Sequence, residues 1–241
     1  MFNINYTFHW NQAFRALPDM LEGALITLQI AVLSMLIGIV IGVLLALAKE
    51  ARFAPLRWFA NTWIEIARNT PALFQVYMIY FGIPAVLQLS ASLFGIDFRA
   101  LGINIFYLDS YWAVLVGIAF NNAGYLAETF RGGLRAVPPT QTRAARSLGF
   151  NAVDSFRLIV LPQMFRAVFH PMTNQMVWAI LMTSIGIFVG LNTDLTGITQ
   201  ELNARTFRTF EFFALAAAIY YVIAKIVTGG ARLIAWRLFR Y

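Results

Sequence analysis

Seven uncharged polar side chains lie inside long apolar stretches of the sequence and could bind a small polar molecule there. They are Gln75, Asn121, Asn122, Asn174, Gln175, Thr183 and Ser184. Amide and hydroxyl groups surrounded by hydrocarbon need hydrogen-bond partners, because hydrocarbon offers none. Two interpretations stay open. The side chains could line a substrate path and bind the amino and carboxylate groups of a zwitterion, or they could join helices through hydrogen bonds.

Two glutamate–arginine pairs have a spacing that favours contact within one helix. Glu65 precedes Arg68 by three positions, and Glu128 precedes Arg131 by the same interval. Residues three apart lie on one helix face, so each pair is expected to form an ion pair near a membrane edge. A structural role at the helix ends is the first interpretation, and a part in gating is the alternative.

The remaining composition argues against several kinds of chemistry within this chain. It contains no cysteine, which excludes disulfides and thiolate metal sites, and His9 and His170 are far apart in the sequence. A phosphate-binding G-x-x-x-x-G-K-S/T loop needs its lysine, and neither Lys49 nor Lys225 has such a context. We therefore expect no metal site, no cofactor and no enzymatic activity in this chain. A partner would have to bind ATP and magnesium if these supply energy.

The elements that must position these residues are predicted to be membrane helices. Sixty per cent of the residues are hydrophobic and 12% are charged, which is unusual for a soluble domain. We predict an all-α polytopic membrane protein with five transmembrane helices, at residues 23–48, 64–83, 111–130, 157–188 and 210–228. A bend is expected at Pro71, and breaks are expected at Pro162 and Pro171. Residues 85–110 are predicted to form an external loop.

The basic residues predict the orientation of these helices. Eleven of the 18 lysines and arginines fall in the first and third loops and the C-terminal tail, against four in the N-terminal segment and the other two loops. The positive-inside rule then places the N-terminus in the periplasm and the C-terminus in the cytoplasm. We divide the chain into a periplasmic segment (1–22), a transmembrane domain (23–228) with a cytoplasmic loop (131–157), and a basic tail (229–241). This block distribution is typical of membrane topology, so the net charge of +7 does not indicate nucleic-acid binding.

Small residues recur at every fourth position in the first predicted span, at Ser34, Gly38, Gly42 and Ala46. This spacing favours a close contact with another helix. The ordinary glycine content of a membrane helix is the alternative.

A short polar helix is predicted in the cytoplasmic loop. Thr140 is the expected N-cap, and Gly149 is expected to end the helix in the left-handed conformation. Asn151 then begins another helix, with Asp154 as its capping-box partner. A short capped helix between two membrane spans must lie at the membrane surface, where it can serve as a docking element.

The loop resembles the EAA loop of bacterial ABC-importer permeases. The resemblance rests on Ala144 and Ala145, on Gly149 four positions after Ala145, and on the Ile159–Pro162 run. The sequence around Tyr125–Gly133 and the Glu65–Pro71 motif resemble the polar amino-acid group of these permeases. The family usually has Glu where Arg143 stands, Gly where Thr140 stands and Lys where Leu181 stands. On the predicted capping, Arg143 is the third helical residue, where a cation opposes the helix dipole.

The resemblance implies an ABC type I importer permease fold in the bacterial inner membrane and a set of partners. These would be a dimer of ABC ATPase subunits, a second permease subunit, a periplasmic amino-acid-binding protein and membrane lipid. The residues expected to contact the ATPase are Thr140, Gln141, Arg143, Ala144, Ala145, Ser147 and Gly149. The predicted function is therefore that of the permease subunit of an ATP-driven importer of polar amino acids. Two alternatives are a non-transporting scaffold that recruits a cytoplasmic partner and an ion-coupled secondary transporter.

Overall fold

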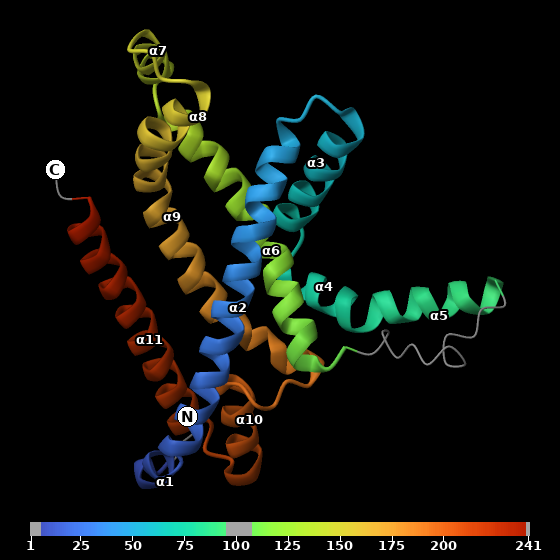
Figure 1. Cartoon of the computed structure of the whole chain (residues 1–241). Helices are drawn as coiled ribbons and strands as arrows, with labels where there is room; N and C mark the ends of the chain where they lie inside the picture. The colour runs from blue at the N-terminus through green and yellow to red at the C-terminus, as the bar shows by residue number, and fades with distance from the viewer. Residues whose placement is uncertain (1–5, 95–107, 240–241) are drawn as a thin grey trace, which may run out of the picture.

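The computed structural model describes residues 6–94 and 108–239 and is helical throughout, with no strand in these ranges. Three predicted segments lie partly outside the described residues: the first five residues, residues 95–107 of the external loop, and the last two residues of the tail. Two long helices form the centre of the molecule, α2 (Leu17–Lys49) and α6 (Ser110–Ala136), and they pack along each other. Figure 1 shows α9 (Leu161–Met182) beside this pair and α11 (Thr209–Leu238) farther out, beyond α9.

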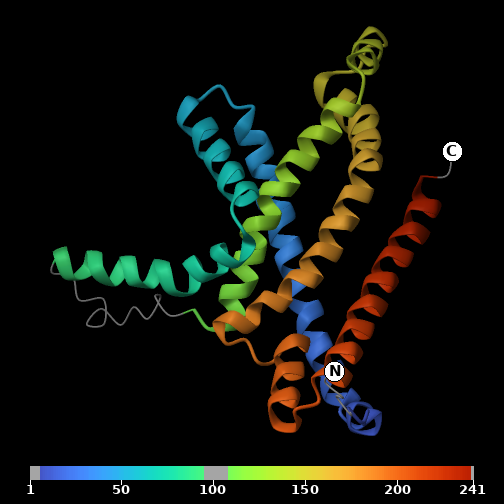
Figure 2. The ribbon, with the colours of Figure 1, turned by 180° about the vertical axis from the view of Figure 1, so that it is seen from behind.

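Shorter elements join these helices. At the end of the molecule near the N-terminus lie α1 (Trp10–Arg15) and α10 (Leu195–Thr206), as Figure 2 shows from behind. At the opposite end lie the α2–α3 hairpin, whose second helix is α3 (Ala54–Asn69), and the short helix α7 (Pro139–Ser147). Two π-helical turns, Met78–Gly82 and Ser155–Val160, connect α4 (Ala72–Tyr77) to α5 (Ile83–Phe94) and α8 (Ala152–Asp154) to α9. A 3₁₀ turn over Thr183–Val189 follows α9.

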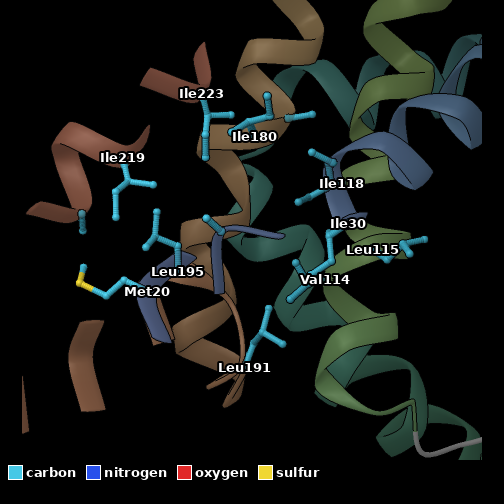
Figure 3. Close-up of a cluster of buried hydrophobic side chains, with 14 of the residues drawn as sticks. Met20, Ile30, Val114, Leu115, Ile118, Ile180, Leu191, Leu195, Ile219 and Ile223 are labelled. Carbon is cyan, nitrogen blue, oxygen red and sulfur yellow. The ribbon is translucent and has the colours of Figure 1, made fainter. Parts of the chain in front are cut away.

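The largest hydrophobic core lies towards the N-terminal end of the molecule, where α2, α6, α9, α10 and α11 meet. Figure 3 shows Met20 of α2 beside Leu195 of α10, and Ile30 of α2 beside Val114 of α6. These side chains are buried. Towards the other end, α6 is packed against α3 and α9 by smaller clusters. The core therefore fixes α6 among its neighbours along most of its length.

Four helical stretches of the described residues are long and apolar enough to cross a membrane: Leu17–Lys49, Ala72–Ala91, Ala152–Val189 and Thr209–Leu238. The predicted third span, 111–130 within α6, is not among them, and the polar Asn121 and Asn122 lower its mean hydropathy. The prediction of one continuous span over 64–83 is wrong, because α3 ends at Asn69 and a new helix begins at Ala72.

The prolines of the fourth span do not break it. Pro162 stands two residues after the π-helical turn Ser155–Val160, and Pro171 lies inside a helix that continues to Met182. The helical run bends but extends from Ala152 to Val189. The predicted external loop at 85–110 begins as helix, because α5 continues to Phe94. The predicted tail likewise begins as helix, since α11 continues to Leu238.

The small residues of α2 make the close contact that their spacing favours. Ser34, Gly38, Gly42 and Ala46 are all buried. A Cβ at Gly38 would lie 2.8 Å from Cβ of Asn122, and a Cβ at Gly42 would lie 2.9 Å from Cβ of Leu126. Both distances are shorter than real Cβ contacts, so the α2–α6 seam at these positions requires glycine.

We predict that Gly42→Ala and Gly229→Ala change stability in opposite directions. The methyl group at residue 42 would also meet backbone atoms of α6 at 3.2 Å, and this overpacking should cost about 1–3 kcal/mol. A Cβ at Gly229 would meet nothing within 4 Å, so alanine there should stabilise α11 by up to about 1 kcal/mol through helix propensity. Thermal unfolding of the detergent-purified chain measures both. Equal melting temperatures for Gly42→Ala and the wild type would contradict a glycine-dependent seam.

Candidate docking helix and polar path

The short helix α7 lies between the ends of α6 and α9, at the end of the molecule opposite α10 (Figure 1). It begins two residues earlier than the sequence predicts. Pro138 occupies the N-cap position and Pro139 the first helical position, so the prediction that Thr140 caps the helix is wrong. Proline suits this position because its missing N–H would have no partner in the helix anyway. Arg143 is consequently the fifth helical residue and lies beyond the turn where the dipole disfavours a cation.

The other end of α7 has the predicted left-handed glycine. Gly149 has φ +89°, and its N–H donates to the Arg146 carbonyl over 3.1 Å. The N–H of Phe150 donates to the Ala145 carbonyl over 3.2 Å. These two hydrogen bonds form a Schellman motif, which satisfies carbonyls that the helix end leaves free. The Gly149 backbone therefore fixes the angle at which the chain leaves α7.

The next helix begins with part of the predicted capping box. The Asn151 side chain accepts from the Asp154 N–H over 2.8 Å, as expected of an N-cap. The reciprocal bond runs between side chains, from Asn151 Nδ2 to Asp154 Oδ2 over 2.6 Å. Asn151 and Gly149 together hold the turn between α7 and α8 rigid.

The exposed face of α7 differs in part from the set of residues predicted to contact the ATPase. Ala145 is buried and packs within the chain, whereas Gln141, Arg143, Ala144, Arg146 and Ser147 are exposed. Two apolar side chains that the sequence analysis did not select are even more exposed: Leu148 at 80% and Val153 at 71%. They lie on either side of the Gly149 turn, and large apolar residues in a loop rich in arginine were the available signal.

An ion network joins the α7 end of α6 to the end of α2. The predicted pair is confirmed, with Arg131 Nη1 2.8 Å from Glu128 Oε1. Lys49 Nζ lies 2.8 Å from the same oxygen, and Arg131 Nε lies 3.2 Å from Glu50 Oε1. Glu128 and Arg131 are largely buried, so these bonds are less screened by solvent than surface pairs. The network ties α6 to α2 immediately before the chain enters α7.

The second predicted ion pair does not form. The Glu65 carboxylate accepts from Asn69 Nδ2 over 2.6 Å. The guanidinium of Arg68 lies over the Tyr125 ring at 5.7 Å from its centroid, a cation–π arrangement. Spacing within one helix could not predict Tyr125 as the partner of Arg68, because Tyr125 lies on α6. For the same reason it could not predict that Lys49 and Glu50, at the end of α2, join the ion network of Glu128 and Arg131.

Two of the seven polar side chains bond a backbone carbonyl at the helix break before Pro71. Proline has no N–H for the carbonyl of Ala67, one turn earlier. Gln75 Nε2 donates to that oxygen over 3.0 Å, and Asn121 Nδ2 donates to it over 2.8 Å. Asn121 Nδ2 is also 3.1 Å from Gln75 Oε1. Both side chains are buried, and their amides hold α3, α4 and α6 together.

The other five polar side chains lie on α6, on α9 and in the 3₁₀ turn that follows α9. Gln175 Nε2 donates to Asn122 Oδ1 over 2.8 Å, which joins the two helices. Asn122 is fully buried, and its Nδ2 has no partner among the described residues. Asn174 is exposed. The hydroxyls of Thr183 and Ser184 donate to carbonyls of their own helical run, those of Ile180 and Leu181.

A buried carboxyl group outside the candidate spans was not predicted. Asp194 precedes α10, and its Oδ1 accepts from the Gly197 N–H over 2.8 Å as an N-cap. Its Oδ2 has no partner among the described residues, and the side chain is buried. Burial raises the pKa of Asp194 to about 6, because the charged form loses hydration there.

A family model matches most of the chain, and curated relatives match it along nearly their whole length. The model is described as "Binding-protein-dependent transport system inner membrane component" and matches residues 38–240. Octopine transport system permease protein OccM of Rhizobium radiobacter is 36% identical over 96% of this chain and 89% of its own length. Glutamine transport system permease protein GlnP of Escherichia coli K12 is 31% identical over 92% of this chain and 93% of its own length. Arginine transport system permease protein ArtQ of Bacillus subtilis is 31% identical over 88% and 89%.

Solved structures have the same fold. A chain from the structure titled "Crystal structure of an amino acid ABC transporter with histidines" is 28% identical, covers 96% of this chain and all of its own, and has a TM-score of 0.81. A chain of the inward-facing MetNI methionine ABC transporter has a TM-score of 0.62 at 15% identity, which shows a common fold alone. The predicted ABC importer permease fold is confirmed.

We predict that ionisation of Asp194 destabilises the protein. Its folded-state pKa of about 6 exceeds the ordinary 3.8, so the contribution of Asp194 to stability is most favourable below pH 3.8 and falls as the pH rises towards 6. The full penalty, on the order of 3 kcal/mol, is present above that pH. Asn can accept the same Gly197 hydrogen bond without titrating, so Asp194→Asn should raise the melting temperature at pH 7.5 and leave it nearly unchanged at pH 4. A gain of equal size at both pH values would contradict this assignment.

Proposed function

Because the chain belongs to the family of binding-protein-dependent transport system inner membrane components, we propose that it carries polar amino acids across the bacterial inner membrane. It is the permease subunit of an ATP-driven importer, and ATP hydrolysis takes place in separate ATPase subunits. ATPase and binding-protein partners are a general property of this family. The observation that carries the proposed cargo is the similarity, along nearly the whole chain, to permeases named for arginine, glutamine and octopine transport.

In the proposed arrangement five helices cross the membrane: the four long apolar stretches and, between the second and third of them in the chain, α6. α6 lies between α2 and α9 and packs against α3 and α4, so neighbouring helices cover Asn121 and Asn122. A helix shielded in this way need not be as apolar as one that faces lipid. The N-terminus is then periplasmic, the loop 131–157 and the tail 229–241 are cytoplasmic, and residues 1–22 lie outside the transmembrane domain.

The proposed contact with the ATPase is α7 together with the turn after it. Exposed Arg143 and Arg146 offer positive charge, and exposed Leu148 and Val153 offer apolar surface. Such a combination suits a partner with an acidic rim and an apolar pocket. Each of two permease subunits would dock one ATPase subunit, which binds ATP and magnesium, and a periplasmic amino-acid-binding protein would deliver the cargo.

The proposed polar path includes fewer side chains than the seven candidates of the sequence analysis. Gln75 and Asn121 already bond the Ala67 carbonyl, and Thr183 and Ser184 bond their own helical run. Asn174 is exposed and Gln175 is half-buried on α9. Gln175 bonds the buried Asn122, whose Nδ2 has no partner among the described residues. These three amides have donors and acceptors suited to a zwitterion.

We predict that Gly149→Val abolishes coupling to the ATPase without preventing membrane insertion. Valine at φ +89° costs about 1–2 kcal/mol and would displace the turn that orients α7, Leu148 and Val153. Co-purification of the ATPase and uptake by cells should both fall. Gly132→Ala is the matched control, because a Cβ at this helical glycine near the end of α6 would meet nothing within 4 Å. Normal co-purification and uptake with Gly149→Val would contradict the docking assignment.

We predict that Asn174→Leu and Gln175→Leu reduce uptake of a polar amino acid roughly tenfold or more each, the value of a hydrogen bond to a charged group. Uptake of radiolabelled arginine, glutamine and histidine by cells that express the complete transporter measures the effect and the cargo. Thr173→Val is the control, since its hydroxyl bonds the Phe169 carbonyl of its own helix. Wild-type uptake by both leucine variants would remove α9 from the path.

A further inference from the structure

An apolar groove of about 420 Å³ lies on the outer surface of the α2–α3 hairpin. Its lining is aliphatic and aromatic and includes Leu44 and Leu47 of α2 and Phe59 and Trp63 of α3. Leu44 is 59% exposed and Leu47 is 63% exposed, so the groove faces outward from the helical core. In a membrane-embedded chain, such a surface faces hydrocarbon unless another protein covers it.

The groove has a fixed floor. The Trp63 indole donates to the Phe120 carbonyl over 3.3 Å, and its ring lies 4.7 Å from the Phe120 ring. Phe59 packs edge-on against Trp63 at 5.8 Å. The side chains of α3 are therefore held in place by α6, and the groove does not depend on an occupant to keep its shape.

The groove ends at the turn of the hairpin, where positive charge gathers. Its α2 wall runs from Ile41 to Ala48, about 10 Å at 1.5 Å per residue, and stops at the last turn of the helix. The turn that follows carries Arg52, and Arg57 folds back onto it with Nη1 3.2 Å from the Ala51 carbonyl. Both arginines are exposed.

These two charges have no acidic partner among the described residues. Glu50, the nearest carboxylate in the sequence, lies 3.2 Å from Arg131 and belongs to the α2–α6 ion network. Lys49 also turns away from the groove, to Glu128. The hairpin turn therefore carries two guanidinium groups without an acidic partner among the described residues, next in the chain to the Ala48 and Leu56 ends of the groove lining.

We propose that this groove binds one anionic phospholipid, with an acyl chain along α2 and α3 and the headgroup phosphate on Arg52 and Arg57. The lining suits hydrocarbon, and the groove's length of about 10 Å fits within one leaflet, half of a hydrocarbon core about 30 Å thick. Guanidinium groups bind phosphate oxygens in a bidentate manner and attract anionic headgroups. The inference requires the chain to lie in a membrane and does not depend on the identity of the cargo.

The test compares lipids retained by the purified full chain. The protein is extracted into detergent with equal amounts of phosphatidylglycerol and phosphatidylcholine of identical acyl chains, and native mass spectrometry counts the lipids bound. We expect one phosphatidylglycerol in preference to phosphatidylcholine. Each arginine-to-glutamine change, Arg52→Gln or Arg57→Gln, should lower this preference about fivefold. Leu44→Trp, which fills the groove from an exposed position, should lower retention of both lipids.

Matched variants separate this site from a general attraction to basic residues. Arg232→Gln with Arg237→Gln removes two positive charges, one more than either single change, from exposed positions at the end of α11, away from the groove. This control should retain the wild-type preference for phosphatidylglycerol. A loss of preference in this control as large as in Arg52→Gln or Arg57→Gln, no preference in the wild type, or lipid retention unaffected by Leu44→Trp would each overturn the proposal. Occupation of the groove by a second copy of the chain would appear as a protein dimer without bound lipid and would overturn it as well.

Discussion

The arrangement of the helices depends on the requirement that each backbone polar group be paired where no water is present. Pro71 leaves the Ala67 carbonyl without its helical donor, and Gln75 and Asn121 supply two donors in its place. Because this bond is made from α4 and α6, the end of α3 is fixed to both of them. The break also lets α4 and α5 leave in a new direction, as Figure 1 shows. Gln75 and Asn121, which the sequence offers as candidate substrate ligands, thus connect α3, α4 and α6 through hydrogen bonds.

The polar side chains of α6 are compatible with its position among other helices for a related reason. A helix covered on several sides by other helices exchanges lipid contacts for protein contacts, so the cost of a polar side chain depends on its neighbours and not on mean hydropathy. Asn121 donates to the Ala67 carbonyl, and Asn122 accepts a hydrogen bond from Gln175. The glycines of α2 permit the approach that covers them, since a Cβ at Gly38 would collide with Asn122.

The sequence predicted features that local physics decides and missed those that tertiary contacts decide. Gly149 is left-handed as expected, since no other residue type ends a helix so readily in that conformation. The Glu128–Arg131 contact agrees with the spacing of two residues on one helix face. The equally spaced Glu65 and Arg68 do not pair, because Asn69 and Tyr125 are available to them. The cap of α7 was misplaced because a threonine near a helix start was favoured over Pro139 at the first helical position.

The position of the ion network bears on how a force at α7 would reach the spans. α7 follows α6 after two residues, and Gly133 near the end of α6 meets α9 so closely that a Cβ would lie 2.2 Å from Val168. Arg131, two residues before that contact, bonds Glu128 of its own helix and Glu50 at the end of α2. Packed side chains and partly buried ion pairs resist separation more than they resist movement as a unit. If α7 is the docking helix, a displacement there would therefore move the ends of α2, α6 and α9 together and not α6 alone.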